Sequence, residues 1–373
     1  MKVKLGDIFE IGSGGTPSKS HPEYYGGDIP WVKTGDLKSE YLYEVEDFIT
    51  KEGLKNSSAK LYEPDTVLIA MYGATIGATS ILKMDACTNQ ACAAFKKNDK
   101  VIPEYLYYFL KSQKVKFVKD GVGGAQPNIS AGYLKKVEME LPSLDEQRAI
   151  VEVLDKTTNI MVMRNQEIAS LDNLIKARFV EMFGDMYLNS KGWSEAKLES
   201  MADVVSGITK GRKTKSEDLT EVPYMAVSNV KDGYIDWTTV KTIGATQQEI
   251  EQYRLLADDV LMTEGGDPDK VGRGAIIKEP LENCIHQNHI FRVRLDESVV
   301  LPEFFAEYLQ HQRSKRYFLG CAKQTTGIAS INMTQLRALP VLIPPLSKQE
   351  EFVLFKAQVD KSKVTKQIDS PIS

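Results

Sequence analysis

A glycine-rich stretch near the start of the chain, IGSGGTPSK (residues 11–19), has the residue types of a loop that binds phosphate. Glycines let backbone N–H groups approach an anion closely, and hydroxyl and lysine side chains add hydrogen bonds and charge. Such a loop could hold a nucleotide in an enzyme or contact the phosphates of a nucleic acid. Turn formation is the simpler interpretation of Gly12, Gly14 and Gly15.

The other candidate reaction motifs are incomplete. GITKGRK (residues 207–213) lacks the GxxxxGK[ST] spacing of a nucleotide-binding P-loop. IPPL (residues 343–346) lacks both ends of the Asn/Asp-Pro-Pro-aromatic motif of amino-methyltransferases. No ExK follows Asp65 as a nuclease would require, so Asp65 is interpreted as a turn residue. His286 and His289 on a strand would face opposite sides, which argues against a shared metal, and no metal site is predicted.

The composition is that of a globular protein, with 42% hydrophobic and 26% charged residues in a chain of 373. This length predicts two or three domains. The net charge of −4 argues mildly against nucleic acid, although local basic patches could still bind it. There is no apolar run of roughly 20 residues and no signal-peptide core, so a cytoplasmic protein without membrane contact is expected. Without a CxxC pair, the cysteines are predicted to be buried apolar residues: Cys87, Cys92, Cys284 and Cys321.

The chain repeats itself. LGDIFEIGSG (residues 5–14) and LESMADVVSG (residues 198–207) both begin with Leu and end with Ser-Gly, 193 positions apart. The same offset relates IPWVKTGDL to VPYMAVSNV and DTVLIAMYG to DDVLMTEGG. After insertions, CTNQ is matched to CIHQ, PNIS to INMT, and LPSLDEQ to IPPLSKQ. A unit of about 145 residues therefore occurs twice, with similar elements and different loops, as expected of one scaffold that recognises two different targets.

Each copy is expected to have a mixed α/β fold. DTVLIAMYG, DDVLMT, ACAAFKK and HIFRVRL predict buried strands. Residues 103–119 and 302–318 predict helices, because a proline opens each segment and apolar residues recur at spacings of three and four.

A long helix is expected to join the copies. Residues 144–183 contain neither Pro nor Gly, and Gly184 follows as a helix-ending residue. Such a helix would be about 60 Å long, and one domain cannot bury its apolar stripe, so a second helix is needed. The segment from residue 346 to about Ile368 begins at the repeat position of the first helix and could pair with it antiparallel, giving a pseudo-twofold molecule. The predicted coiled-coil and partner-docking residues are Val151, Leu154, Met161, Ile168, Leu171, Ile175, Met182, Phe352, Phe355 and Val359.

This arrangement resembles the specificity subunits of type I restriction–modification systems. The resemblance is carried by IGSGGTPSK, IPWVKTGDL, YGATIG, NQA and LPSLDEQRAIVEVLD, by their order and by the repetition. It implies two target-recognition domains (residues 1–142 and 185–343), a central spacer helix (143–184) and a short distal helix (344–373). It also implies a non-catalytic protein in which each domain reads one half of a bipartite, gapped site on double-stranded DNA.

The resemblance further implies that the helices set the spacing and bind two modification (methyltransferase) subunits, which restriction subunits then join. This chain would need no cofactor, because S-adenosylmethionine, ATP and Mg²⁺ would be bound by the partners. The distal helix is shorter than is usual in the family, which leaves room for self-association through the helices.

Loops that combine basic residues with amides and hydroxyls are the candidate DNA contacts, since the first bind phosphates and the others read base edges. Loops that differ between the copies are favoured for base readout, whereas Gln90 and Gln287 could instead hold backbone in both copies. The candidates are Ser13, Thr16, Ser18, Lys19, Lys33, Thr34, Tyr72, Thr75, Gln90, Gln126, Asn128, Thr209, Lys210, Arg212, Lys213, Asn229, Asp267, Lys270, Arg273, Gln287, Lys323, Gln324 and Thr325.

Two other functions compete with DNA recognition. The glycine-rich loop could belong to an enzyme that binds a nucleotide or S-adenosylmethionine. The chain could also be a two-domain scaffold that binds only protein.

Overall fold

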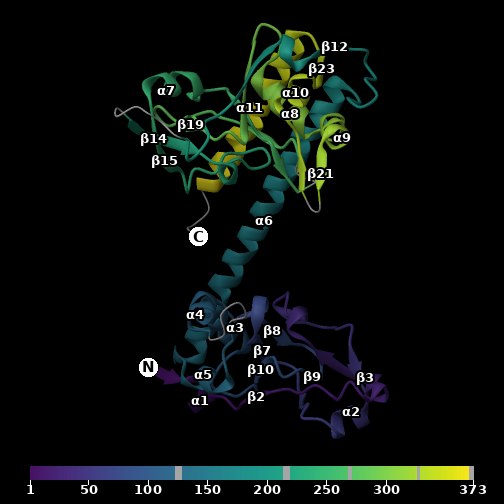
Figure 1. Cartoon of the computed structure of the whole chain (residues 1–373). Coiled ribbons are helices and arrows are strands. Elements are labelled where there is room, and N and C mark those ends of the chain that lie inside the picture. Colours follow the sequence, from purple (N-terminus) through teal and green to yellow (C-terminus); the bar gives the residue numbers. More distant parts are fainter. Residues whose placement is uncertain (122–127, 213–218, 268–270, 326–327, 369–373) are drawn as a thin grey trace. The chain divides into compact units, whose positions relative to one another are not determined.

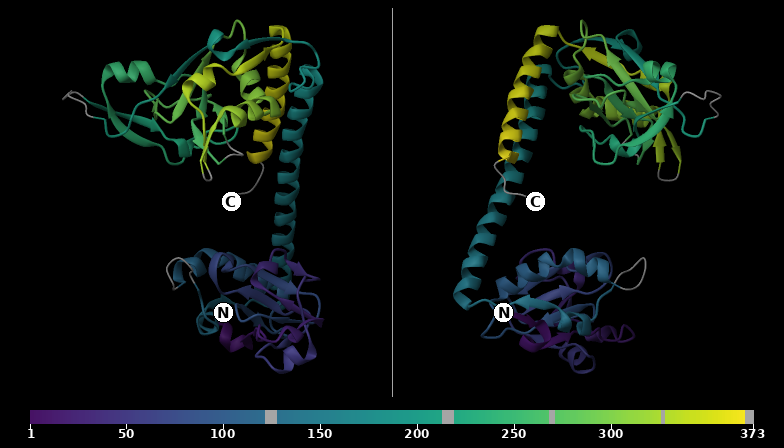
Figure 2. Two further views of the ribbon diagram at one scale, coloured as in Figure 1. Left: turned by 45° about the vertical axis from the view of Figure 1, so that its right-hand side comes forward. Right: turned by 90° about the vertical axis from the view of Figure 1, so that its left-hand side faces the viewer.

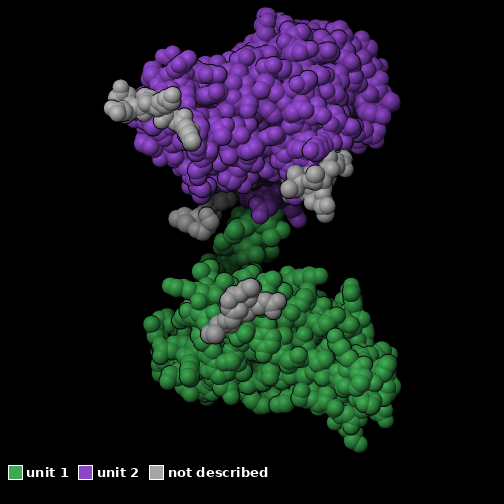
Figure 3. All heavy atoms as spheres, viewed as in Figure 1, with its two compact units in different colours: residues 1–163 green, residues 164–373 purple. Residues whose placement is uncertain are grey.

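The chain forms two compact units, Met1–Met163 (unit 1) and Arg164–Ser373 (unit 2), and each is described by itself (Figures 1 and 3). The computed structural model describes residues 1–121, 128–212, 219–267, 271–325 and 328–368. The boundary between the units falls inside the long helix α6 (Leu144–Phe183). No helix within the described residues is both long and apolar enough to cross a bilayer.

Unit 1 is built on a five-stranded sheet of order β2-β10-β7-β8-β4 and a four-stranded sheet of order β5-β3-β9-β6, with β1 paired to β11. Its strands are β1 Lys2–Lys4, β2 Ile11–Ser13, β3 Tyr25–Val32, β4 Tyr41–Leu42, β5 Phe48–Ile49, β6 Leu61–Tyr62, β7 Val67–Ala70, β8 Thr79–Leu82, β9 Ala86–Thr88, β10 Cys92–Phe95 and β11 Glu138–Glu140. Its helices before α6 are α1 Leu5–Ile8, α2 Lys51–Lys55, α3 Pro103–Ser112, α4 Lys114–Asp120 and α5 Ala131–Lys136, with short 3-10 turns η1 Pro22–Tyr24, η2 Thr34–Asp36 and η3 Gly73–Thr75.

The central strand β7 explains why its sequence is a continuous apolar run. Successive strand residues point to opposite faces of a sheet. Val67 and Ile69 belong to the cluster under α3 and α5, whereas Leu68 and Ala70 belong to a second cluster on the other face. Both faces are therefore buried, as the sequence of this strand predicts.

Unit 2 repeats this plan with sheets of order β13-β20-β16-β18 and β15-β14-β19, the pair β12-β23, and a further sheet β17-β22-β21. Its strands are β12 Ser194–Lys197, β13 Ala202–Ser206, β14 Thr220–Met225, β15 Lys241–Ala245, β16 Val260–Thr263, β17 Gly265–Gly266, β18 Gly274–Ile276, β19 Ile285–His286, β20 Ile290–Leu295, β21 Lys323–Thr325, β22 Ile328–Ser330 and β23 Pro340–Ile343. Its helices after α6 are α7 Gln247–Tyr253, α8 Pro302–Gln310, α9 Gln312–Cys321, α10 Met333–Arg337 and α11 Leu346–Ile368, with 3-10 turns η4 Leu198–Ser200 and η5 Val227–Asn229. The expected mixed α/β class is confirmed.

The two helices predicted after the prolines are each broken in two. In unit 2 the break is at His311, whose backbone is extended with ψ 158°. The break lets the His311 ring stack on Phe179 of α6, with ring centroids 4.3 Å apart. The hydroxyl of Ser314 donates to the carbonyl of Tyr308 near the end of α8, which satisfies one of the freed acceptors. A tertiary contact thus ended a helix that the sequence period would have continued.

Helix α6 has the predicted bounds and ends at Gly184, which has φ +78°. Within unit 2, α6 and α11 pair antiparallel (Figure 2). Arg178 bonds to Glu351 at 2.7 Å, and further back along α6 Asp172 pairs with Lys363 at 2.7 Å. The predicted pairing of the distal helix with the central one is therefore observed in this unit.

The start of each helix is fixed by the same buried glutamine. Gln147 of α6 accepts a hydrogen bond from Ile102 N at 2.9 Å and donates to Lys100 O and Pro142 O. Gln349 of α11 accepts from Leu301 N at 2.8 Å and donates to two carbonyls of its own unit. Both glutamines have 0% exposure, so each helix is attached to its own unit in the same way.

Candidate nucleic-acid interface

In unit 1, five segments far apart in sequence meet at one end of the sheets. They are the segments after β2, β3 and β7, the turn between β9 and β10, and the segment before α5; we call this meeting point the loop junction. Backbone hydrogen bonds of 2.8–3.0 Å join the segments: Gly15 N to Thr88 O, Asn89 N to Val32 O, Met71 N to Ala91 O, and Ile129 N to Met71 O. Five loops from distant parts of the sequence are therefore held together by backbone hydrogen bonds.

Unit 2 builds the same loop junction. Its backbone bonds, again 2.8–3.0 Å long, join Ile208 N to His286 O, Gln287 N to Met225 O, Glu264 N to His289 O, and Ile331 N to Glu264 O. The backbone of the junction is common to the units, whereas most of its side chains differ.

This equivalence corrects the alignment of the repeats. Thr88 and His286 occupy the same strand position, each paired in parallel with the last residue of the preceding long strand. Gln90 therefore corresponds to Asn288 and not to Gln287, so matching CTNQ to CIHQ was wrong by one residue. The idea that Gln90 and Gln287 hold the same backbone in both copies is wrong for the same reason.

The match of PNIS to INMT needs the same kind of correction. Ile129 and Ile331 are equivalent in the loop junctions, so PNIS aligns with residues 329–332. The helix caps agree, because Ser130 accepts from Tyr133 N and Asn332 accepts from Gln335 N.

The glycines of residues 11–19 serve close backbone packing. A Cβ on Gly14 would lie 1.9 Å from Thr88 O, and a Cβ on its equivalent Gly207 would lie 1.9 Å from His286 O. The N–H groups of Gly14 and Gly15 already donate to backbone carbonyls. These amides are therefore not directed at a phosphate, and Gly14 and Gly15 serve close backbone packing where a turn was expected.

Several candidate DNA contacts of unit 1 lie on its loop junction. The Thr16 hydroxyl donates to the side-chain oxygen of Gln90, which joins two of the segments through their side chains. Tyr72 is 43% exposed and forms an isolated backbone bridge with Asn128. The Thr75 hydroxyl donates to Tyr72 O at 3.1 Å. These polar groups share one surface and could face a common ligand.

The remaining candidates of unit 1 are less uniform. Lys33 forms an ion pair with Asp47, which raises the pKa of the lysine and neutralises its charge locally. Ser18 and Lys19 are exposed, and the Ser18 hydroxyl lies 2.7 Å from that of Ser20. Ser13 and Thr34 are half-buried, and Gln126 lies outside the described residues.

In unit 2 the structure corrects one candidate and shows an intramolecular partner for another. Asn229 has 0% exposure, and its amide accepts from Ala226 N and donates to Asp236 O, both at 2.9 Å. The prediction that Asn229 reads a base was wrong, because both ends of the amide hold the turn after β14. Arg212 bonds twice to the Glu249 carboxylate at 2.6 Å. Arg212 therefore ties its loop to α7, and its assignment as a DNA contact stays a prediction.

The Arg212–Glu249 pair has a clear electrostatic signature. The hydrogen bonds from Arg212 lower the pKa of Glu249 to about 2. The carboxylate engages Nε and Nη2 of Arg212 in two parallel hydrogen bonds, an arrangement that is stronger than a single neutral hydrogen bond.

The other candidates of unit 2 surround its loop junction or lie beyond the described residues. Thr209, Lys210, Asp267 and Lys323 are exposed, while Arg273 and Gln287 are half-buried. Gln324 and Thr325 lie in β21, and their side chains are not among those described. Lys213 and Lys270 also lie outside the described residues.

Sequence reasoning missed two junction residues of unit 2, Glu264 and His289. It considered His289 only as a metal ligand. In the structure His289 Nδ1 is hydrogen-bonded to a Glu264 carboxylate oxygen, whereas His286 is fully buried with Nδ1 3.0 Å from Ile290 O. Comparison of the two repeats gives the signal that was missed. Glu264 and His289 are polar, whereas the equivalent residues of unit 1, Met71 and Ala91, are apolar.

The predicted helix seam is observed in unit 2 only. Ile175 and Met182 of α6 are 3% and 7% exposed, and Phe352 and Val359 of α11 are 0% and 7% exposed. Leu171 and Phe355 are partly buried against the same core, and Ile168 is half-buried.

In unit 1 the seam is only partly covered. Val151 and Leu154 are half-buried on the side of α6 that faces the unit. Met161 is 47% exposed, so it is not packed in a seam within unit 1, and its role in partner docking stays a prediction.

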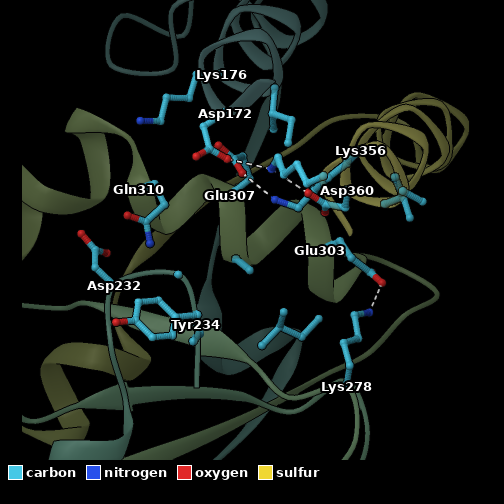
Figure 4. A pocket seen from close by; sticks show the side chains of 18 residues that line it. Asp172, Lys176, Asp232, Tyr234, Lys278, Glu303, Glu307, Gln310, Lys356 and Asp360 are labelled. Atoms are coloured by element: carbon cyan, nitrogen blue, oxygen red, sulfur yellow. Dashed lines mark hydrogen bonds and ion pairs between the residues drawn. The ribbon is translucent and has the colours of Figure 1, made fainter. Parts of the chain in front are cut away.

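A cavity of about 670 Å³ lies beside the paired helices of unit 2 (Figure 4). Most of its charged residues form ion pairs: Lys356 with Glu307 at 3.0 Å, Lys363 with Asp172 and Asp360 at 2.7 Å, and Lys278 with Glu303. These pairs link α6, α8, α11 and the segment after β18. These paired charges thus stabilise the packing of the helices.

Cysteine chemistry is also disfavoured. Burial raises the pKa of Cys87 to about 11 and the pKa of Cys92 and of Cys284 to about 12. A thiol with so high a pKa is a poor nucleophile and a poor metal ligand near neutral pH.

Comparison with known proteins gives the family. The model of the type I restriction modification DNA specificity domain matches residues 1–173 and again residues 190–372. The chain belongs to this family. The two matched segments agree with the internal repeat, and the family assignment agrees with the resemblance seen in the sequence.

Among the relatives of this family member is the type I restriction enzyme MjaIX specificity subunit of Methanocaldococcus jannaschii. It is 30% identical over 250 residues, which are 62% of this chain and 58% of that relative. The type I restriction enzyme EcoKI specificity subunit of Escherichia coli K12 is 20% identical over 350 residues, 87% of this chain and 74% of that relative. The match thus spans little more than half the length of the first relative.

Solved structures share the fold. The S subunit of a type I restriction–modification system from M. genitalium matches with a TM-score of 0.53 at 16% identity, covering 99% of this chain and 91% of that chain. A chain from a study of complex assembly and conformational transition of the type I R-M system matches with a TM-score of 0.59 at 15% identity, covering 98% and 91%.

Proposed function

We propose that this chain is the DNA-binding specificity subunit of a type I restriction–modification complex. Each unit would read one half of a bipartite, gapped site on double-stranded DNA, and the chain itself would catalyse no reaction. The observation that carries the proposal is the duplicated loop junction, where one backbone framework presents different polar side chains. A framework that is fixed while its exposed side chains vary suits two readers of two sequences.

The names of the relatives support this proposal, since the MjaIX and EcoKI proteins are specificity subunits of type I restriction enzymes. The geometry weighs against an enzyme that uses the glycine-rich loop, because the amides of Gly14 and Gly15 are already engaged. A protein that recognises a sequence in duplex DNA needs loops that reach the edges of the nucleobases from a rigid support. The loop junction supplies such a support.

The partners follow from the same proposal. We propose that the helices α6 and α11 bind the modification (methyltransferase) subunits and set the spacing of the half-sites, about one helical turn apart. Restriction subunits would join that complex, which would act in the cytoplasm. S-adenosylmethionine, ATP and Mg²⁺ would be bound by the partners and not by this chain.

Methylation-site mapping in cells with and without this chain tests the proposal. A gapped bipartite motif should be methylated only when the chain is present. Replacing residues 1–142 by the recognition domain of another specificity subunit should change one half of the motif and leave the other half unchanged. Retention of both halves after this exchange would contradict the proposal.

Calorimetry separates the enzyme alternative. The isolated chain should not bind S-adenosylmethionine or ATP, and tight binding of either would count decisively for an enzyme. A scaffold that binds only protein would fail to retain duplex DNA in the presence of its methyltransferase partner at any salt concentration.

A further inference from the structure

Glu264 and His289 form an exposed side-chain pair at the loop junction of unit 2. Their side chains are 34% and 55% exposed, and His289 Nδ1 is hydrogen-bonded to Glu264 Oε2. Together with Val227, Gly265 and Ser330 they line an open cavity of about 410 Å³. The pair is therefore accessible to a ligand while its backbone is held in the junction.

The fold does not need this pair. In unit 1, Met71 N donates to Ala91 O at 2.8 Å, just as Glu264 N donates to His289 O at 3.0 Å. Met71 is only 2% exposed. The same backbone bond thus forms with apolar side chains. A polar pair that the framework does not require is a candidate for recognition that is specific to unit 2.

The pair has a defined hydrogen-bonding character. An ionised carboxylate only accepts hydrogen bonds, so in the neutral imidazole the proton lies on Nδ1 and Nε2 is an acceptor. The Asn288 side-chain nitrogen lies 3.4 Å from His289 Nε2. This separation is longer than the roughly 2.7–3.2 Å of a usual hydrogen bond, so the lone pair of Nε2 is open to a ligand. In the major groove, adenine N6 and cytosine N4 present amino donors, whereas guanine O6 and thymine O4 are acceptors.

We propose that His289, positioned by Glu264, is a specificity-determining residue of unit 2 that accepts a hydrogen bond from the exocyclic amine of adenine or cytosine. Glu264 acts through His289 and is a positioning residue. The inference rests on the proposed function, since it concerns the half-site that unit 2 reads.

The test uses the full chain assembled with its modification subunits and a library of duplex DNA with randomised sequence as the probe. Bound duplexes are sequenced for the wild type and for His289→Ala, Glu264→Gln and Glu264→Asp. His289→Ala should lose about 5- to 100-fold preference at one position of one half-site, the loss expected of a base contact. Glu264→Gln should weaken the preference at the same position, and Glu264→Asp should restore part of it.

A matched control is present in unit 1, where His21 Nδ1 and Glu23 Oε1 form an exposed pair at 2.8 Å. His21→Ala should leave the half-site affected by His289→Ala unchanged. Thermal unfolding of each variant shows whether a loss of preference reflects a loss of folding.

The outcomes separate this inference from the proposed function. If the wild-type complex selects no bipartite motif, the proposed function fails. If it selects one and His289→Ala selects the same motif with the same preference, only the inference is overturned. Loss of both half-sites together with a lower unfolding temperature would also overturn it, because it would show a structural role for His289.

Discussion

Phe352 of α11 is fully buried against Phe179 and Phe183 of α6 in unit 2, with ring centroids 5.2 and 5.8 Å apart. Ile150 stands at the equivalent position of unit 1, three residues after its buried glutamine, and is 39% exposed. Val153, the equivalent of Phe355, is 62% exposed. The repeats thus share the polar attachment of the helix and differ in what covers its apolar side.

This difference shows which contacts the repeat requires. The glutamine attachment is local to each unit and is formed twice. The apolar seam needs a second helix, and the described part of unit 1 leaves Ile150 and Val153 of its helix exposed. Exposed apolar stripes on a helix are typical of surfaces that bind a partner, in line with the docking proposed for the modification subunits.

The largest expected effect separates the two seams. Phe352→Ala should lower the free energy of unfolding of unit 2 by about 3–5 kcal/mol, because it leaves a cavity in an aromatic cluster. Ile150→Ala should change the stability of unit 1 by less than about 1 kcal/mol, because the side chain is partly solvated already. Hydrogen exchange measured separately for the peptides of each unit checks both values. Equal destabilisation by the two substitutions would remove the contrast between the seams.

The shared attachment predicts a symmetrical result. Gln147→Ala and Gln349→Ala should each cost about 2–3 kcal/mol, because each leaves several buried backbone groups without a partner. The first substitution should destabilise unit 1 and the second unit 2, as read from denaturant unfolding combined with hydrogen exchange. If both lowered the stability of one unit only, the equivalence of the two glutamines would be wrong.

Lowering the pH should reduce the stability of unit 2 through a junction residue that has no titratable equivalent in unit 1. Burial lowers the pKa of His286 to about 4, and its equivalent in unit 1 is Thr88, which does not titrate. The unfolded state, with a histidine pKa near 6.5, binds the proton more readily, so the stability of unit 2 falls as the pH drops from about 6.5 to about 4. The loss should be roughly 2 kcal/mol at pH 5.

The control for the acid effect is His286→Gln. Thermal unfolding of this variant between pH 7 and pH 5 should lack the part of the pH dependence that belongs to the histidine. A variant whose unfolding follows the wild-type pH curve would show that another group causes the effect.

The smallest effect concerns a contact between α3 and α6 in unit 1. The Tyr108 hydroxyl donates to Asp155 at 2.6 Å, whereas the equivalent position in unit 2 carries Glu307, paired with Lys356. Tyr108→Phe should lower the stability of unit 1 by about 1 kcal/mol, the usual contribution of one such hydrogen bond. Tyr43→Phe is the control, because Tyr43 is 69% exposed. A Tyr108→Phe variant as stable as this control would mean that the bond contributes nothing.

The sequence was most informative where structure depends on local pattern. The bounds of α6 followed from residues 144–183 lacking Pro and Gly and from the glycine that ends them. The turn role of Asp65 also followed, and Asp65 indeed has φ +69°. These features depend on the backbone conformation of a few neighbouring residues, so a short stretch of sequence is enough to predict them.

Contacts between distant residues decided the rest. The partner of Arg212, Glu249, lies 37 positions further along the chain and could not be inferred from the neighbouring sequence. Asn229 was predicted to read a base, and its amide instead holds the turn that surrounds it. The register of the repeats was set by strand pairing, because Thr88 and His286 pair with equivalent residues. The sequence by itself determined the repeat, the long helix and the α/β class. Only the tertiary structure decided which polar side chains are used within the fold and which, such as His289, remain exposed at the junction, because each side chain's partners are set by packing across the whole unit.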